Sequence, residues 1–181
     1  MKNNIVQLAF VGIFICFWNT GVFAQEEFFK NYDNPTDGII SAYKGEFADK
    51  IDAIDKQIRD IKQDKGFTEQ KSSRKDSSGF HFVYKKGDEF QIIIVINNET
   101  EIHKRVVWLF EKERMFYCEQ IWTNFKTNKI VDYQKFYLEE GVLFAWFKQE
   151  NQLVDNKSIE FKEMVKSLAE YSDILKKDFT N

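Results

Sequence analysis

The sequence predicts an α+β protein in which a six-stranded antiparallel β-meander, forming a curled sheet, is flanked by an N-terminal and a C-terminal amphipathic helix. Three observations support this fold class. The middle of the chain alternates short β-branched and aromatic runs with turn formers, an isoleucine-rich helical pattern precedes it, and a second helical pattern comes after it. Runs of strands bordered by helices are typical of a sheet covered by helices in layers.

Six apolar runs indicate the strands, and each is followed by polar or glycine-containing residues typical of turns. The predicted strands are 80–84, 90–96, 102–110, 115–123, 130–138 and 142–148. The connections are short, whereas a parallel return would need a crossover of a dozen or more residues. Consecutive strands should therefore be antiparallel neighbours.

The turns predict a register. We take Lys112 and Glu113 as a two-residue turn, and Gly141 as the left-handed residue of a three-residue loop. The pairs expected from these turns are Phe110 with Met115, Trp108 with Tyr117, Leu109 with Phe116, Val107 with Cys118, His103 with Trp122, Phe136 with Phe144, and Tyr137 with Leu143. Large apolar groups then lie on both faces of the sheet. Such a sheet must be covered on both sides, closed into a barrel-like form, or left with an exposed aromatic surface.

The first helix is indicated by apolar residues at alternating steps of four and three, with charged residues between them. The apolar positions are Phe47, Ile51, Ile54, Ile58 and Ile61. Ser41 is a plausible first residue and Gly66 a plausible stop. One amphipathic helix docked on the sheet explains the pattern better than a dimeric coiled coil, because only about two heptads precede Gly66. Residues 67–79 are polar and serine-rich, which predicts a connection.

The second helix should begin at Asp155, whose side chain can cap it while Val154 packs on Ile159. Its apolar face comprises Phe161, Val165, Leu168, Ser172, Leu175 and Phe179. We expect this helix to end near Lys177 and to lie on the sheet.

The first 24 residues predict a signal peptide. Lys2 supplies a positive start, residues 5–18 are largely apolar, and Ala24 is the small residue that a signal peptidase needs. Retention as a membrane anchor is the alternative, and a lipoprotein modified at Cys16 is disfavoured because the bulky Ile15 precedes the cysteine. The expected location is secreted or periplasmic. We assign residues 25–40 to a leader and residues 41–181 to a single domain.

Charge content limits the expected binding partners, and cysteine content limits the possible disulfide bonds. The chain has 26 basic and 29 acidic residues, and loss of Lys2 with the signal leaves a net charge of about −4. No basic tract marks a nucleic-acid or anionic-lipid surface, so we expect neither partner and no membrane span after cleavage. Cys118 would then have no cysteine to pair with, and its aromatic surroundings predict a core thiol.

The search for catalytic and metal-binding patterns finds none, and we expect no cofactor. His81 and His103 lack metal-ligand spacing. Glu119 is the one acid expected in apolar surroundings within a strand. The enzyme alternative is therefore a small hydrolase or isomerase with a pocket around His81 or His103 and Glu119.

The aromatic residues of the meander are the candidate ligand-binding residues, because Trp and Tyr combine a rigid face with a polar edge. They are Trp108, Trp122, Trp146, Tyr117, Tyr133 and Tyr137. The leading hypothesis is an exported, non-enzymatic binding module that holds a protein, peptide or hydrophobic small molecule on an aromatic sheet face or groove. A third class is an inhibitor or envelope-assembly component that acts through a sheet edge.

Residues 135–147, Lys-Phe-Tyr-Leu-Glu-Glu-Gly-Val-Leu-Phe-Ala-Trp-Phe, resemble a hairpin of small uncharacterised secreted proteins of Gram-negative bacteria. The isoleucine-rich helix and the Val-Phe-Ala-Gln end of the signal are similar to theirs as well, and the match covers about a third of the chain. The resemblance implies a periplasmic or outer-surface location. It carries no activity and no functional residue.

Overall fold

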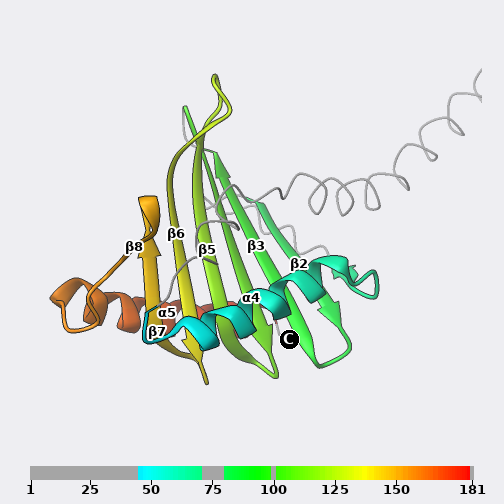
Figure 1. Ribbon diagram of the computed structural model, residues 1–181. Helices are drawn as coiled ribbons and strands as arrows, with labels where there is room; N and C mark the ends of the chain where they lie inside the picture. The colour runs from blue at the N-terminus through cyan, green and yellow to red at the C-terminus, as the bar shows by residue number, and fades with distance from the viewer. Residues whose placement is uncertain (1–44, 71–79, 99–100, 180–181) are drawn as a thin grey trace, which may run out of the picture. The chain divides into compact units, whose positions relative to one another are not determined.

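The computed structural model describes residues 45–70, 80–98 and 101–179 (Figure 1). The chain divides into two compact units, residues 1–38 and 39–181, and every described residue belongs to the second. The predicted signal peptide and leader, including Cys16, lie outside the described residues, as does Ser41.

The described part of the chain forms an α+β fold with one antiparallel sheet, in which each strand pairs with its neighbours in sequence and β1 and β8 form the two ends. The strands are β1 (Thr68–Gln70), β2 (Phe80–Lys86), β3 (Phe90–Asn98), β4 (Ile102–Glu111), β5 (Arg114–Asn124), β6 (Lys129–Glu139), β7 (Val142–Lys148) and β8 (Gln152–Leu153). The six predicted strands correspond to β2 through β7. The prediction missed β1 and β8, which are too short to show a periodic pattern, and β1 begins inside the stretch predicted as a connection.

Two helices cover opposite faces of this open sheet, α4 (Ala48–Gln63) and α5 (Ile159–Phe179) (Figure 1). Successive residues of a strand point to opposite faces, so each paired row across the sheet belongs to one helix. The α5 face includes the row Val83, Ile93, Trp108, Cys118, Phe136 and Trp146. The α4 face includes the row Tyr84, Ile92, Leu109, Tyr117, Tyr137 and Ala145.

The helix α4 has the predicted amphipathic pattern. Its buried residues are Ile51, Ile58 and Ile61. The Tyr137 hydroxyl donates a hydrogen bond of 3.0 Å to Asp55 Oδ1, which ties the helix to β6. The helix and its apolar face could be predicted because the apolar spacing has one consistent period, but residues 45–47 form a bend and a turn, so the helix begins later than the predicted start at Ser41.

The helix α5 buries Phe161, Leu168 and Leu175 against the sheet, as predicted. Its start differs from the prediction, because Ser158 Oγ rather than Asp155 accepts the hydrogen bond from the Phe161 amide, at 3.1 Å. Ile159 is 76% exposed, so the expected contact with Val154 does not form. Val154 packs on the core of the α5 face instead.

The register between β4 and β5 holds at the turn and then shifts. Lys112 and Glu113 have φ of 46° and 66°, which is the two-residue turn expected, and Phe110 pairs with Met115. A bulge at Phe116 then inserts one extra residue. The remaining predicted pairs of these strands were wrong by one position: Leu109 pairs with Tyr117, Trp108 with Cys118, Val107 with Glu119, His103 with Thr123, and Lys104 with Trp122.

The register between β6 and β7 also differs from the prediction. Glu140 and Gly141 have φ of 54° and 83° and form a two-residue turn in place of the expected three-residue loop. The strand β7 then contains a bulge at Phe144. The expected pairs were therefore wrong: Phe136 pairs with Trp146, Tyr137 with Ala145, and Leu138 with Leu143.

Candidate functional site

Five of the six candidate aromatic residues lie in the core. Less than a tenth of each side chain is exposed, and the five are Trp108, Trp146, Tyr117, Tyr133 and Tyr137. Trp146 stacks on Phe136 with ring centroids 5.5 Å apart. A side chain enclosed in this way contributes to stability and reaches no ligand without a rearrangement. A role for these five in binding stays a prediction.

Trp122 is the exception, because it is only half-buried. It lies on the α5 face near the end of β5, paired with Lys104 on one side and Asp132 on the other. The Lys104 ammonium lies 4.8 Å from the centroid of the Trp122 ring, within range of a cation–π contact. The candidate site is therefore built around this residue.

We define the distal surface as residues 101–105, 120–124, the turn 125–128 and residues 129–132. These residues form the ends of β4, β5 and β6 that lie farthest from α4 in Figure 1. Strand β7 pairs only with residues 135–139 of β6, so the rest of β6 extends beyond it. The distal surface is a projecting part of the sheet for this reason.

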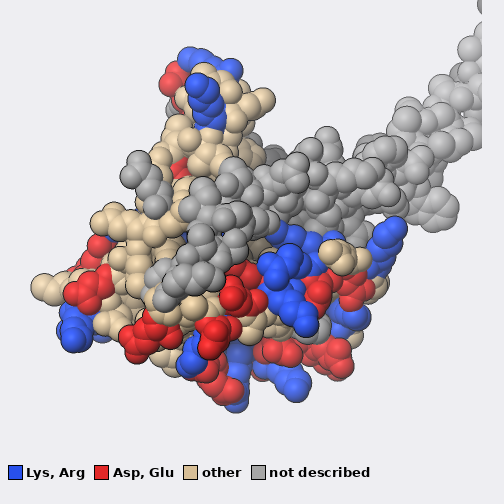
Figure 2. All heavy atoms as spheres, viewed as in Figure 1, with Lys and Arg blue, Asp and Glu red and all other residues tan. Residues whose placement is uncertain are grey.

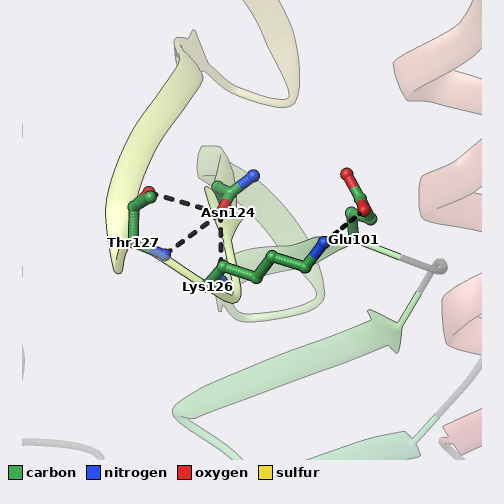
Figure 3. A network of polar contacts seen from close by, with 4 residues as sticks. All are labelled: Glu101, Asn124, Lys126 and Thr127. Carbon is green, nitrogen blue, oxygen red and sulfur yellow. Dashed lines mark hydrogen bonds and ion pairs between the residues drawn. The ribbon is translucent and has the colours of Figure 1, made fainter.

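The turn at the end of the distal surface is held by its own polar groups (Figure 3). Asn124 Oδ1 accepts hydrogen bonds from the amides of Lys126 and Thr127, at 3.0 and 3.1 Å. The Lys126 ammonium forms an ion pair of 2.7 Å with Glu101, which fastens the turn to the start of β4. An asparagine that accepts bonds from the next backbone amides is typical of a fixed turn, so the turn is preorganised.

This turn presents apolar side chains to solvent. Phe125 is 46% exposed, and its ring meets the His103 ring edge-on with centroids 5.6 Å apart. Val131 is 43% exposed at a third bulge, where Trp122 pairs with Asp132 and Thr123 with Ile130. The distal surface therefore has exposed apolar side chains at its turn, and the half-buried Trp122 lies on the α5 face, opposite the His103 that Phe125 contacts.

The distal surface differs in charge from the whole chain, which carries a net charge of −3. The cationic side chains are Lys104, Lys126 and Lys129, and the carboxylates are Glu101 and Asp132; Arg105 pairs with the buried Glu119. Figure 2 shows basic side chains gathered at the projecting end with an acidic side chain beside them. The distal surface is therefore mildly basic on a mildly acidic protein.

A buried ionic cluster supports the distal surface from the α4 face. Glu119 is 1% exposed, and its carboxylate accepts a hydrogen bond of 2.9 Å from the Tyr117 hydroxyl. Arg105 Nη2 lies 3.7 Å and Lys135 Nζ 4.0 Å from this carboxylate. Glu119 is buried within its strand, but the prediction of apolar surroundings was wrong, because the Tyr117 hydroxyl and cations from both neighbouring strands hold the carboxylate.

The two histidines do not form a common site with Glu119. His81 pairs with Val95 on the α5 face, whereas Glu119 lies on the α4 face. His103 shares the face of Glu119 but lies four positions further along the sheet, roughly 13 Å at 3.3 Å per residue. Burial, with help from the nearby Arg105, holds the pKa of His103 below its usual value. This geometry gives no support to the enzyme alternative.

Among the described residues there is no group of three or more His, Cys, Asp or Glu side chains placed to hold a metal ion. Cys118 is fully buried on the α5 face, and burial raises the pKa of its thiol far above the usual value. The prediction of a core cysteine is confirmed.

Sequence reasoning missed Phe125, Val131 and Lys104 as members of the site. Phe125 did carry a signal, since it is an aromatic residue inside the polar turn Thr-Asn-Phe-Lys-Thr-Asn. An aromatic side chain in a turn has little core to enter and tends to be exposed. Val131 and Lys104 had no such signal, because their positions depend on the bulges at Val131 and Phe116.

Comparison of the chain with protein-family models, with curated proteins and with solved structures found no match. Within residues 45–70, 80–98 and 101–179, none of the helices combines the length and apolar character required to cross a bilayer.

Proposed function

We propose that this protein is an exported, non-enzymatic binding module that holds a protein or peptide partner on its distal surface. The partner segment is acidic and carries an apolar side chain that contacts Phe125. Export to the periplasm or the exterior is part of the proposal and rests on the sequence of residues 1–24.

One observation carries this proposal: Phe125 is nearly half exposed on a turn that its own hydrogen bonds hold in place. When a partner covers an exposed aromatic side chain, its apolar surface is removed from water, which favours binding. A fixed turn loses little conformational freedom on binding, which favours affinity. Aromatic residues, Phe included, are enriched in the cores of protein interfaces.

The charge of the distal surface selects the kind of partner. Lys129 has no ion-pair partner among the described residues, and the nearby Lys104 lies over the Trp122 ring. Cations around exposed apolar side chains favour a partner with carboxylates around an apolar side chain. Such a pairing predicts an association rate that falls as salt is added.

The sheet-edge alternative has less support. The end strands β1 and β8 contain three and two residues, and short end strands discourage pairing with another chain. On β6, the Gln149 side chain donates a hydrogen bond of 3.3 Å to the Val131 carbonyl, so one backbone acceptor of that edge is already occupied.

The test compares Phe125→Ala with Tyr171→Ala in the mature chain. Tyr171 is 56% exposed on α5 and serves as a matched exposed aromatic outside the distal surface. A partner captured from envelope extract would be identified, purified and titrated calorimetrically against each variant. We expect Phe125→Ala to weaken binding about 30-fold, the effect of a 2 kcal/mol hot spot, and Tyr171→Ala to leave it unchanged. Equal affinity of the two variants would contradict the proposal, as would the absence of any partner.

A further inference from the structure

A separate hollow of about 240 Å³ lies at the β7 end of the sheet, away from the distal surface. Its apolar walls are Phe47, Phe144, Leu153 and Val154, and the carboxylate-bearing residues Glu46 and Asp155 also line it. Sites for small molecules usually exceed 300 Å³, so this one has room for a single long side chain or a small fragment.

The aromatic walls suit a cation. The rings of Phe47 and Phe144 lie 5.4 Å apart at an angle of 60°. The Lys50 ammonium already lies 5.6 Å from the centroid of the Phe144 ring, within cation–π range, while it pairs with Glu139 at 2.6 Å. The Phe144 ring therefore already accepts one cation, whose charge Glu139 balances.

The charges of the hollow favour a cation as well. Glu46 and Asp155 supply two carboxylates, and no basic side chain lines the hollow among the described residues. Asp155 Oδ1 accepts a bond of 2.9 Å from the Lys157 amide, which fixes the carboxylate in position. The N-terminus of α4 begins beside Phe47 and adds about half a positive charge, which offsets only part of the two negative charges.

We propose that this hollow is a binding site for a single arginine side chain presented by an extended peptide segment of a partner. The guanidinium stacks against the Phe47 and Phe144 rings while its N–H groups donate to Glu46 and Asp155. Arginine fits better than lysine because its planar, weakly hydrated head both stacks on rings and donates to carboxylates. The site is independent of the distal surface and of the proposed function there.

The test uses the folded chain and three blocked tripeptides, in which glycines flank arginine, citrulline or glutamine. Citrulline preserves the shape of arginine and removes its charge. Nuclear magnetic resonance titration of the isotope-labelled protein should show that the arginine peptide shifts the signals of Phe47, Phe144 and Val154, and that the other two peptides do not. Phe125→Ala should retain this response, which separates the result from the fate of the distal surface.

Variants then test the two carboxylates. Glu46→Gln and Asp155→Asn preserve size, and asparagine can still accept the Lys157 amide bond. The double variant should weaken the arginine peptide at least tenfold, whereas Glu163→Gln, an exposed carboxylate on α5, should not. The proposal is overturned if citrulline binds as well as arginine, if the double variant binds normally, or if no shift occurs up to about 10 mM peptide, roughly the weakest affinity expected from one cation–ring contact and two ion pairs.

Discussion

Replacing Glu119 with glutamine tests the buried ionic cluster beneath the distal surface. The change preserves side-chain volume and the acceptor for the Tyr117 hydroxyl, and it removes only the negative charge. Lys135, whose side chain is 4% exposed, would then lose its carboxylate partner. Arg105 is 22% exposed and can turn toward water, so most of the cost should fall on Lys135.

The magnitude depends on this burial. Removing one partner of a buried ion pair costs about 3–5 kcal/mol, because a buried charge remains uncompensated. The separations of 3.7 and 4.0 Å are long for ion pairs, so we expect the lower end, about 3 kcal/mol. For a chain of this size that loss corresponds to a decrease in melting temperature of roughly 6–12 °C.

The assay is urea denaturation monitored by tryptophan fluorescence, with melting temperature as a second measurement. Glu119→Gln combined with Lys135→Met removes both charges and retains most of the lysine stem. This double variant should recover at least half of the lost stability, because the buried cation is gone. The reasoning is refuted if Glu119→Gln is as stable as the native chain, or if the double variant is less stable than the single one.

Three further predictions concern single residues. Cys118 should resist thiol reagents at pH 8 in the folded protein and react only on unfolding, because burial raises the pKa of its thiol; rapid labelling of the native state would contradict its burial. The lowered pKa of His103 means that the unfolded chain binds its proton first, so the stability that His103 contributes is present above pH 6.5 and is lost as pH falls through its folded pKa. Denaturation curves of His103→Gln should show a weaker loss between pH 7 and 5 than the native chain, and identical pH profiles would disprove this assignment. Gly141→Ala should destabilise the protein by about 1 kcal/mol in thermal melts, because its φ of 83° is unfavourable for any residue with a side chain. The added methyl itself would meet no atom within 4 Å, so the cost comes from the backbone alone. An unchanged melting temperature would show that the turn relaxes.

The layer architecture could be predicted from the sequence because each element carries its own period. The apolar residues of α4 repeat at helical spacing, and β2 through β7 are bounded by turn formers. These signals are local and require no knowledge of the partner strand. The two end strands had no local signal, since two or three residues show no alternation.

The face to which each strand residue points could not be predicted, because one inserted residue moves every following side chain of that strand to the opposite face. The bulge at Phe116 moves Trp108 and Tyr117 to opposite faces, although a plain hairpin would pair them. The same shift places Trp122 beside Lys104 instead of His103. Bulges depend on packing across the whole sheet, so sequence spacing alone gives no warning of them.

Exposure was the second property that spacing could not supply. Trp122 and Trp146 both occur within aromatic strands. Trp146 is in β7 and lies under α5. Trp122 is in β5, and its partner Asp132 in β6 lies beyond the residues of β6 that pair with β7. The two tryptophans differ in exposure because β7 is shorter than β5 and β6. Trp146 therefore lies inside the sheet, and Trp122 lies near the projecting end.

Site-specific photo-crosslinking tests the central claim most directly. A benzophenone amino acid would replace Phe125 in one variant and Tyr171 in another, and both would be irradiated in intact cells of the source organism. The account predicts a discrete crosslinked product from position 125 and none from position 171. Crosslinking from position 171 with none from position 125 would contradict the assignment of the distal surface as the binding site.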